Sequence, residues 1–240
     1  MPCLPIISVI IPTYNEKRNI GRLVDVLNKE LAATSFEIIV IDDNSVDGTI
    51  ELMERKSVLN DRIKFLQNPP PKGLSRSILF GLKQAKGQVI VGMDADFNHD
   101  PKIINQLINR LKSEKLDLVI ASRFIKGGGM DDKLRFFLTK LFNLFLRFCF
   151  AFPSTDNASG YYAIRSSVLR KMPLNEIFVG YGEYHLRLVY LAKKMNLKFG
   201  EWPVFYRKRK YGKSKSKLLQ MCFSYLKVAF QLRFCHKNYL

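Results

Sequence analysis

Short apolar runs alternate with amphipathic stretches along the first half of the chain. The runs are rich in Val and Ile and several end at Pro or Asp, which is typical of buried strands. Strands are expected at residues 6–11, 36–41, 63–66, 89–93 and 116–121. Helices are expected from a cap at Asn15 to Leu31, from residues 47–49 onward, at 75–85, and at 101–111, which Pro101 would open.

This alternation predicts an α/β protein with a mostly parallel sheet covered by helices on both faces. Ligands of such sheets bind at the carboxyl ends of the strands. Polar clusters follow four of the expected strands, at residues 14–16, 42–44, 94–96 and 122–123. Their common position in the predicted sheet indicates a single active site.

The most informative cluster is the pair Asp94 and Asp96. Residues i and i+2 of an extended segment point the same way, and two neighbouring carboxylates repel each other unless a cation lies between them. Hard cations such as Mg²⁺ or Mn²⁺ suit this pair and usually bind substrate phosphates as well. Asn98 could add a ligand oxygen. The alternative is an acidic pair in a solvated turn, because Asp-x-Asp alone is a weak motif.

The pattern changes after residue 125. Residues 127–129 are three glycines and are expected to form a flexible loop. Helices are expected at 134–152, 184–195 and 217–234, strands at 161–164 and 199–206, and a basic loop at 207–217. The first and last of these helices combine Phe and Leu with Lys and Arg.

Composition adds an uneven charge. The 240 residues, 47% of them hydrophobic, are expected to form one folded domain with a sizeable core. The net charge is +18, and residues 121–240 hold 23 Lys and Arg against 6 Asp and Glu. This basic second half of the chain indicates an anionic partner. The alternative is that it is only a solubilising surface. A nucleic-acid partner is not expected, because no binding module is visible and the four polar clusters would stay unexplained.

The four cysteines are scattered, which argues against a zinc site and favours a reducing compartment. Residues 1–11 lack a basic leader and run directly into a strand pattern, so no signal peptide is expected. No uncharged apolar run reaches the roughly 18 residues that a membrane span needs. A cytoplasmic, non-integral protein is expected.

The acidic residues suggest a nucleotide-sugar site. A metal at Asp94 and Asp96 would bridge a diphosphate and neutralise the leaving group. Asp43 could accept a hydrogen bond from a base N–H, and Glu16 from a ribose hydroxyl. The alternatives are a first-turn helix carboxylate for Glu16 and an Asx-turn for Asp43.

The cations suggest phosphate binding. Arg123, Arg209 and Lys215 could hold phosphates, Arg as a fork and Lys as a point charge. The alternative for Arg209 and Lys215 is an ordinary solvated loop.

Several motifs resemble those of the family 2 glycosyltransferases, in particular the dolichol-phosphate mannosyltransferase-like branch of polyprenol-phosphate sugar transferases. The matching segments are residues 12–16, 41–49, 93–96, 122–128, 156–160, 201–204 and 209–215. The resemblance as a whole spans about residues 6–217. The segments at 123–128 and 209–215 resemble the narrower patterns Arg-Phe/Tyr-x-x-Gly-Gly and Arg-x-x-Gly-x-Ser-Lys.

The resemblance implies a GT-A fold and inverting, Mg²⁺- or Mn²⁺-dependent transfer of a hexose, mannose or glucose, from a GDP- or UDP-linked sugar to a polyprenyl phosphate. The implied nucleotide-sugar residues are Pro12, Tyr14, Glu16, Asp43 and Asp94, and the metal residues are Asp94, Asp96 and Asn98. The implied catalytic residues are Asp96, Arg123, Arg209 and Lys215, and the implied acceptor-phosphate residues are Arg123, Arg135 and Ser159.

Two positions depart from the family pattern. Tyr162 stands where the family has a basic residue, and the family's Gln-x-Glu region aligns with residues 185–187, near Glu183. Glu183 would be either a base for a hydroxyl acceptor, as in cell-surface polysaccharide synthesis, or a structural partner for a cation. A phosphate acceptor needs cations and no base, which the basic second half favours. A nucleotidyltransferase would need a Gly-rich phosphate loop, and residues 12–16 are not one.

The expected organisation is a GT-A domain at residues 1–216, including an interfacial helix at 133–152, and an amphipathic basic helix at 217–240. Both helices would lie in the plane of a membrane surface. The alternative is that both are core or dimer helices. The protein is thus expected to be peripheral on the cytoplasmic face of a membrane, alone or with a membrane partner subunit.

Overall fold

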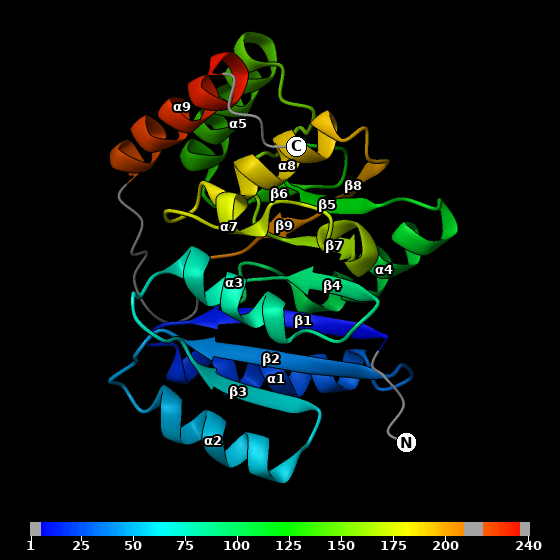
Figure 1. Cartoon of the computed structure of the whole chain (residues 1–240), viewed down its shortest axis with the longest axis vertical. Helices are drawn as coiled ribbons and strands as arrows, with labels where there is room; N and C mark the ends of the chain where they lie inside the picture. Colours follow the sequence, from blue (N-terminus) through cyan, green and yellow to red (C-terminus); the bar gives the residue numbers. More distant parts are fainter. Residues whose placement is uncertain (1–5, 209–217, 236–240) are drawn as a thin grey trace.

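The computed structural model describes residues 6–208 and 218–235, and its centre is a seven-stranded sheet (Figure 1). Its strands are β1 (Ile7–Thr13), β2 (Phe36–Asp42), β3 (Ile63–Gln67), β4 (Val89–Gly92), β5 (Leu118–Ser122), β7 (Tyr162–Arg165) and β8 (Phe199–Pro203). Two short strands, β6 (Gly129–Met130) and β9 (Phe205–Tyr206), form a second sheet. The order in the main sheet is β3-β2-β1-β4-β7-β5-β8, and β7 alone runs antiparallel to its neighbours β4 and β5. The predicted mostly parallel sheet is confirmed.

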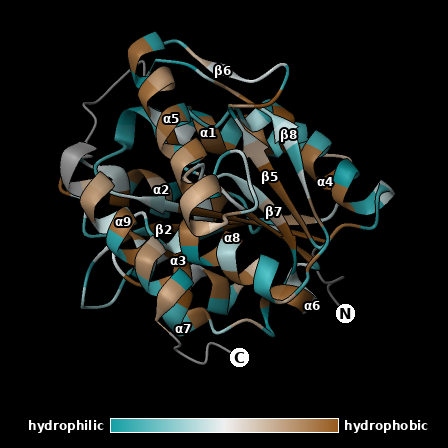
Figure 2. Ribbon diagram, turned by 90° about the horizontal axis from the view of Figure 1, so that it is seen from above, coloured by the Kyte–Doolittle hydropathy of each residue, from teal (hydrophilic) through white to brown (hydrophobic). Residues whose placement is uncertain are grey.

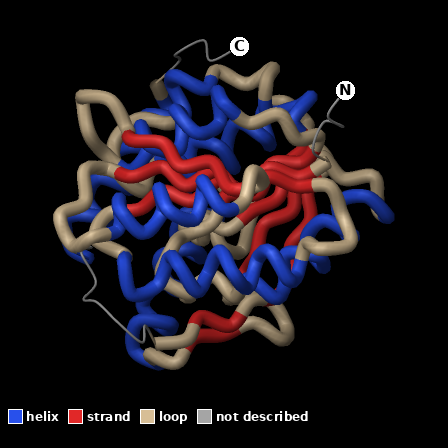
Figure 3. The backbone as a smooth tube through the Cα atoms, turned by 90° about the horizontal axis from the view of Figure 1, so that it is seen from below, coloured by secondary structure: helices blue, strands red, loops and turns tan. Residues whose placement is uncertain are grey.

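Helices cover both faces of this sheet (Figure 3). They are α1 (Lys17–Glu30), α2 (Thr49–Leu59), α3 (Leu74–Gln84), α4 (Ile104–Ser113), α5 (Lys133–Phe150), α6 (Ser166–Leu169), α7 (Leu174–Ile177), α8 (Tyr184–Lys194) and α9 (Leu218–Phe234). Alternate residues of β1 and β2 point to opposite faces of the sheet. One face packs against α1, α2 and α4, and the other packs against α3, α7 and α8. Burial on both faces is why the central strands are apolar without interruption.

A third apolar cluster lies beyond the sheet, where α5 and α9 pack together over α8 (Figure 1). Its buried side chains include Leu146 from α5, Tyr190 from α8 and Tyr225 from α9. The two helices are therefore core helices on their inner sides. Their outer sides keep large apolar side chains exposed, among them Phe148 and Phe223.

Three local expectations are corrected. Asn15 is not a helix cap: its φ is +54°, and its Oδ1 accepts from the Val46 amide, which ties the β1 loop to the β2 loop. Pro101 opens a 3₁₀ turn, η1 (Pro101–Ile103), whose Lys102 amide donates to the Asp100 carboxylate before α4 begins.

The third correction concerns residues 199–206, which form two strands in two sheets. β8 pairs with β5 up to Pro203, which has no N–H to extend a ladder. β9 instead pairs with β6, so part of the expected glycine loop is a strand.

Gly92 is fixed by packing at the end of β4. A Cβ at this position would lie 2.6 Å from the ring of Tyr162, which is fully buried on the neighbouring strand β7. The absence of a side chain lets the tyrosine ring lie against the strand end that leads into Asp94 and Asp96.

A buried carboxylate joins three strands near the opposite, amino-terminal end of the sheet. Glu37 accepts hydrogen bonds from Ser8 Oγ at 2.6 Å and from the Lys86 amide at 2.7 Å, and pairs with Lys64. Burial disfavours the charged form, but the bonds from Lys64, Ser8 and Lys86 outweigh burial and lower the pKa of Glu37. The ionised carboxylate therefore stabilises the folded state.

We expect Glu37→Gln to reduce the free energy of unfolding at pH 7 by about 1–3 kcal/mol. Because the folded pKa lies below the ordinary value of 4.5, this contribution is complete above pH 4.5 and is lost as the pH falls through the folded pKa. Urea unfolding of both proteins should show a difference that shrinks from pH 7 to pH 3.5. Glu54→Gln, at an exposed position, is the control, and a difference independent of pH would contradict the interpretation.

Candidate active site

The acidic pair follows directly after β4. Asp96 is 4% exposed, whereas the Asp94 side chain is 41% exposed. Phe97 has φ +63°, which turns the chain back so that both the amide and the side-chain NH₂ of Asn98 donate to the Asp96 carboxylate, at 2.9 and 3.1 Å. The loop thus brings together the three residues predicted to hold a metal. Asn98 lies beside Asp96 as its hydrogen-bond partner.

A hollow of about 360 Å³, the N-terminal hollow, lies on one side of this pair. The residues predicted to hold a nucleotide-sugar all line it: Pro12, Tyr14, Glu16, Asp43 and Asp94. They come from the carboxyl ends of the adjacent strands β1, β2 and β4, as parallel topology requires.

Asp43 is held in this hollow by the loop after β3. Its Oδ1 accepts from Asn68 Nδ2 at 2.8 Å and from the Gly73 amide at 3.1 Å. The alternative of an Asx-turn at Asp43 is wrong, because the preceding residue, Asp42, accepts from the amide and hydroxyl of Ser45 and caps that turn.

Glu16 lines the hollow from the N-cap position of α1, so it precedes the first turn of the helix, which holds no acidic residue. Its Oε2 accepts from the Asn19 side chain at 2.7 Å. Tyr14, two residues earlier, is 46% exposed at the same edge.

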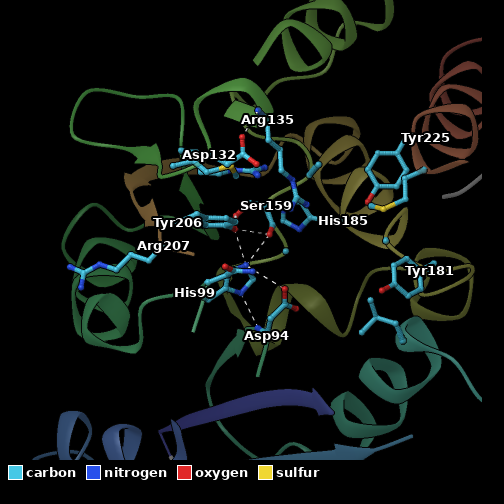
Figure 4. Close-up of a pocket in the computed structure, with 18 of the residues that line it drawn as sticks. Asp94, His99, Asp132, Arg135, Ser159, Tyr181, His185, Tyr206, Arg207 and Tyr225 are labelled. Carbon is cyan, nitrogen blue, oxygen red and sulfur yellow. Dashed lines mark hydrogen bonds and ion pairs between the residues drawn. The ribbon is translucent and has the colours of Figure 1, made fainter. Parts of the chain in front are cut away.

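A second space of about 440 Å³, the cationic cavity, lies on the other side of Asp94 (Figure 4). Four cationic side chains line it: Arg123 after β5, Arg135 on α5, and Arg207 and Lys208 after β9. Asp94 lines both spaces and so stands at the boundary between them, whereas Asp96 lines the N-terminal hollow. Of the other predicted residues, Arg209 and Lys215 lie outside the described residues.

Arg123 forms a buried ion pair that the sequence analysis missed. Its Nε and Nη2 each donate to the Asp156 carboxylate at 2.6 Å, and its guanidinium lies 4.6 Å from the centre of the Tyr206 ring. Burial opposes the charge, but the Asp156 carboxylate holds the pKa of Arg123 above its ordinary value. The predicted phosphate fork of Arg123 is therefore occupied by a carboxylate, and only the remaining guanidinium protons can reach a ligand.

His99 holds the backbone of the loop that carries Asp94 and Asp96. The Asp94 amide donates to His99 Nδ1 at 2.8 Å, so the ring proton is on Nε2, which lies 3.1 Å from the Ser159 carbonyl oxygen and 2.8 Å from Tyr206 Oη. Burial lowers the pKa of His99 to about 4 against the opposing effect of Asp96, so the ring is neutral near pH 7. The 3.7 Å approach of His99 Nε2 to Asp94 Oδ2 is thus not an ion pair at that pH.

Ser159 lines the cavity, but its hydroxyl proton is already used. Ser159 Oγ donates to the Ala121 carbonyl at 2.5 Å, and a hydroxyl has one proton. Its Oγ therefore cannot at the same time donate to an acceptor phosphate, and its part in the site is to hold the cavity wall.

Glu183, the predicted base or cation partner, does not line the cavity. Its carboxylate accepts from the Tyr181 amide at 2.7 Å and from the Ser224 hydroxyl. It therefore ties the loop before α8 to α9.

Four residues of the site were not identified as such from the sequence: His99, Asp156, His185 and Tyr206. His99 follows the acidic pair closely and Asp156 begins a matching motif, so a local signal existed for both. Tyr206 and His185 lie more than 80 residues from the acidic pair. Tyr206 has no local signal, whereas His185 begins the segment that aligns with the family's Gln-x-Glu.

The amino-acid sequence is similar to one family of known proteins and to several of its named relatives. Residues 8–172 match the model of the family described as glycosyl transferase family 2. The chain is 34% identical over 232 residues to a dolichol-phosphate mannosyltransferase from Pyrococcus furiosus, covering 94% of this chain and 63% of that protein. It is 31% identical over 214 residues to a polyprenol monophosphomannose synthase from Mycolicibacterium smegmatis, covering 86% of this chain and 79% of that protein. The chain thus spans less than two thirds of the first of these relatives.

Solved structures share the fold. Glucosyl-3-phosphoglycerate synthase from Mycobacterium tuberculosis, in complex with phosphoglyceric acid, superposes with a TM-score of 0.73 at 19% identity over 98% of this chain and 82% of that one. A structure of the same protein with Mn²⁺, UDP-glucose and glycerol 3-phosphate gives 0.72 at 18% identity over the same shares of each chain. The predicted GT-A fold is confirmed.

We expect Asp156→Asn to destabilise the protein by about 3–5 kcal/mol, because it leaves Arg123 buried without its counter-charge. The double variant Arg123→Met/Asp156→Leu should lose less free energy of unfolding than the sum of the losses in Arg123→Met and in Asp156→Leu, measured by urea unfolding. Asp61→Asn, at an exposed position, is the control. Additive losses in the double variant would mean that the pair is not coupled.

Proposed function

The chain belongs to glycosyl transferase family 2, and from this premise we propose that it transfers a hexose, mannose or glucose, from a nucleotide-sugar to a polyprenyl phosphate with inversion at the anomeric carbon. The single observation that carries the proposal is the position of Asp94, which lines both the N-terminal hollow and the cationic cavity, with Asp96 beside it in the hollow. One space suits a nucleotide and the other an anionic acceptor. The names of the relatives from Pyrococcus furiosus and Mycolicibacterium smegmatis support the acceptor class.

The donor's nucleoside would lie in the N-terminal hollow, against Pro12, Tyr14, Glu16 and Asp43. Asp43 uses Oδ1 for the loop after β3, so Oδ2 is the oxygen that would accept from a base N–H. Both GDP- and UDP-linked sugars meet this requirement, because guanine and uracil each carry an N–H on the pairing edge.

The residues at the acidic pair fit a divalent cation, Mg²⁺ or Mn²⁺. Asp94 and Asp96 offer hard oxygen ligands, and Asn98 lies beside them. Among residues 6–208 and 218–235, no group of three or more His, Cys, Asp or Glu side chains could hold a metal. Diphosphate oxygens would therefore complete the coordination, as Mg²⁺ and Mn²⁺ sites in phosphate enzymes allow. A metal bound there would neutralise charge on the diphosphate leaving group.

The acceptor phosphate would enter the cationic cavity, near Arg123 and Arg135, with Arg209 and Lys215 as further phosphate ligands. An oxygen of the phosphate attacks the anomeric carbon while the bond from that carbon to the diphosphate oxygen breaks, and the nucleoside diphosphate leaves. A phosphate monoester is already anionic at neutral pH and needs no general base. The position of Glu183 outside the cavity lining agrees with this.

The proposal includes binding to the cytoplasmic face of a membrane, alone or with a partner subunit. The outer sides of α5 and α9 carry apolar residues (Figure 2), the most exposed being Leu134, Phe148 and Phe223 at 70%, 85% and 72%. Lys and Arg alternate with them on α5, which suits an anionic lipid surface. Arg135 of α5 and Met221 of α9 also line the cavity, so a membrane-bound acceptor would reach it between these helices.

In the part of the chain that the structure describes, no helix has the length and apolar character to cross a membrane. The domain division proposed from the sequence, with a GT-A domain ending near residue 216 and an interfacial helix after it, has its boundary outside the described residues.

We expect purified protein with Mn²⁺, a polyprenyl phosphate and one of radiolabelled GDP-mannose, UDP-glucose or UDP-N-acetylglucosamine to move label into the organic phase. Asp96→Asn should lower this transfer by roughly 100-fold or more, because it removes a ligand that serves the diphosphate. Asp61→Asn should transfer at the wild-type rate. Metal-dependent donor hydrolysis without transfer would move the acceptor to a saccharide hydroxyl, and failure to bind any donor would refute the proposal.

We expect the double variant Phe137→Glu/Phe148→Glu to lose at least about 10-fold in affinity for vesicles containing anionic lipid, since it places two charges on the apolar side of α5. Co-sedimentation with vesicles measures this. Val58→Glu, at an equally exposed apolar position on α2, should bind as the wild type does. Equal binding by all three proteins would exclude α5 as the membrane-binding element.

A further inference from the structure

His185 is a buried histidine whose two ring nitrogens have no hydrogen-bond partner among the described residues. The residue is 1% exposed and lies in the first turn of α8, at the wall of the cationic cavity (Figure 4). Buried polar atoms are nearly always paired, and an unpaired one costs about 1–3 kcal/mol. Two such atoms on one ring, at the wall of a cavity, point to a ligand that pairs with them.

The protonation state of His185 limits what that ligand can be. Burial lowers its pKa to about 4, with Asp156 acting in the opposite direction and His99 and Arg123 lowering it further. The ring is therefore neutral near pH 7, with one N–H donor and one acceptor nitrogen. A fully ionised phosphate only accepts hydrogen bonds and would leave one nitrogen unpaired, whereas hydroxyl groups can both accept and donate.

The surroundings of His185 differ from the cationic part of the cavity. Tyr184 and Tyr162 are its ring neighbours, with centroids 6.2 and 5.8 Å away, and Tyr181 and Tyr225 line the cavity on the same side as α8 and α9 (Figure 4). Tyrosine rings pack against the C–H faces of sugars and offer further hydroxyls. Tyr162 stands where the resembling family has a basic residue, so the His185 ring has an uncharged neighbour at that position. The wall suits a neutral polyol better than a phosphate.

We propose that His185 binds hydroxyl groups of the transferred hexose, donating from one ring nitrogen and accepting at the other, and so helps to determine which sugar is transferred. The inference rests on the proposed function and adds a specificity-determining residue to it. It also explains why a histidine can stand at a position that aligns with a glutamine, since a Gln amide likewise offers both a donor and an acceptor.

The test separates binding of the sugar from binding of the nucleotide. With Mn²⁺ present, calorimetry would measure the affinity of wild type, His185→Phe and His185→Gln for GDP-mannose and GDP, and for UDP-glucose and UDP. His185→Phe should weaken binding of the preferred nucleotide-sugar by about 10- to 100-fold and leave the matching nucleoside diphosphate unchanged. His185→Gln should restore at least part of the loss. Leu188→Met, one turn further along α8 in the core, controls for packing.

A kinetic measurement tests specificity directly. The ratio of kcat/KM between two epimeric donors that share a nucleotide, GDP-mannose and GDP-glucose or UDP-glucose and UDP-galactose, should shrink by about 10-fold in His185→Phe. The KM for polyprenyl phosphate should stay unchanged. A higher KM for polyprenyl phosphate with intact donor affinity would assign His185 to the acceptor and overturn the inference, as would unchanged donor binding in both variants.

The two proposals fail in different ways. If the wild type binds a nucleotide-sugar through His185 but transfers nothing to polyprenyl phosphate, the proposed acceptor is wrong and the inference about His185 stands. If transfer to polyprenyl phosphate occurs and His185→Phe changes neither donor affinity nor the ratio between epimers, the inference is wrong and the proposed function stands.

Discussion

The buried ion pair between Arg123 and Asp156 is the interaction on which the arrangement of the site depends. It joins the end of β5 to the loop before β7, and the guanidinium lies against the Tyr206 ring from β9. Tyr206 donates to the Ser159 carbonyl and contacts His99, and His99 accepts from the Asp94 amide. An unbroken series of contacts thus runs from a cation at the cavity wall to the backbone of the acidic pair. Such a network is effective only when every member is paired, because an unpaired charge in a dry interior is costly.

The topology of the sheet explains why two binding spaces meet at Asp94. β1, β2 and β4 are parallel and adjacent, so their carboxyl ends deliver Tyr14, Asp43 and Asp94 to one edge. β7 then inserts antiparallel between β4 and β5, and its amino end brings the loop with Asp156 and Ser159 to that same edge. A single reversed strand therefore places a second set of residues beside the first, and Gly92 leaves the space that its Tyr162 needs.

The sequence predicted those parts of the molecule that depend on local pattern. Continuous apolar runs identified the strands. The polar residues after them identified the acidic pair and the N-terminal hollow, because the carboxyl ends of parallel strands lie at the same edge of the sheet. It failed where the partner is distant in the chain. The full guanidinium fork of Arg123 was assigned to a phosphate because nothing near it in sequence indicates Asp156, and Asn15 was predicted to cap a helix because Val46 lies 31 residues away. His185 begins the segment that aligns with the family's Gln-x-Glu, but its unpaired nitrogens become visible only when its neighbours are placed around it.

The excess of basic residues in the second half includes two separate groups, one in the cationic cavity and one on α5, and the proposed acceptor would use both. Arg123, Arg135, Arg207 and Lys208 line the cavity, and other Lys and Arg of α5 lie among its exposed Phe and Leu. A phosphate attached to a lipid would need both groups, one for its charge and one for the surface from which it comes. A free sugar phosphate would need only the first. The exposed apolar side of α5, directly continuous with Arg135 at the cavity, is therefore the feature that favours a lipid-linked acceptor over a small soluble one, and the neutral His185 leaves the charge of that acceptor to the arginines.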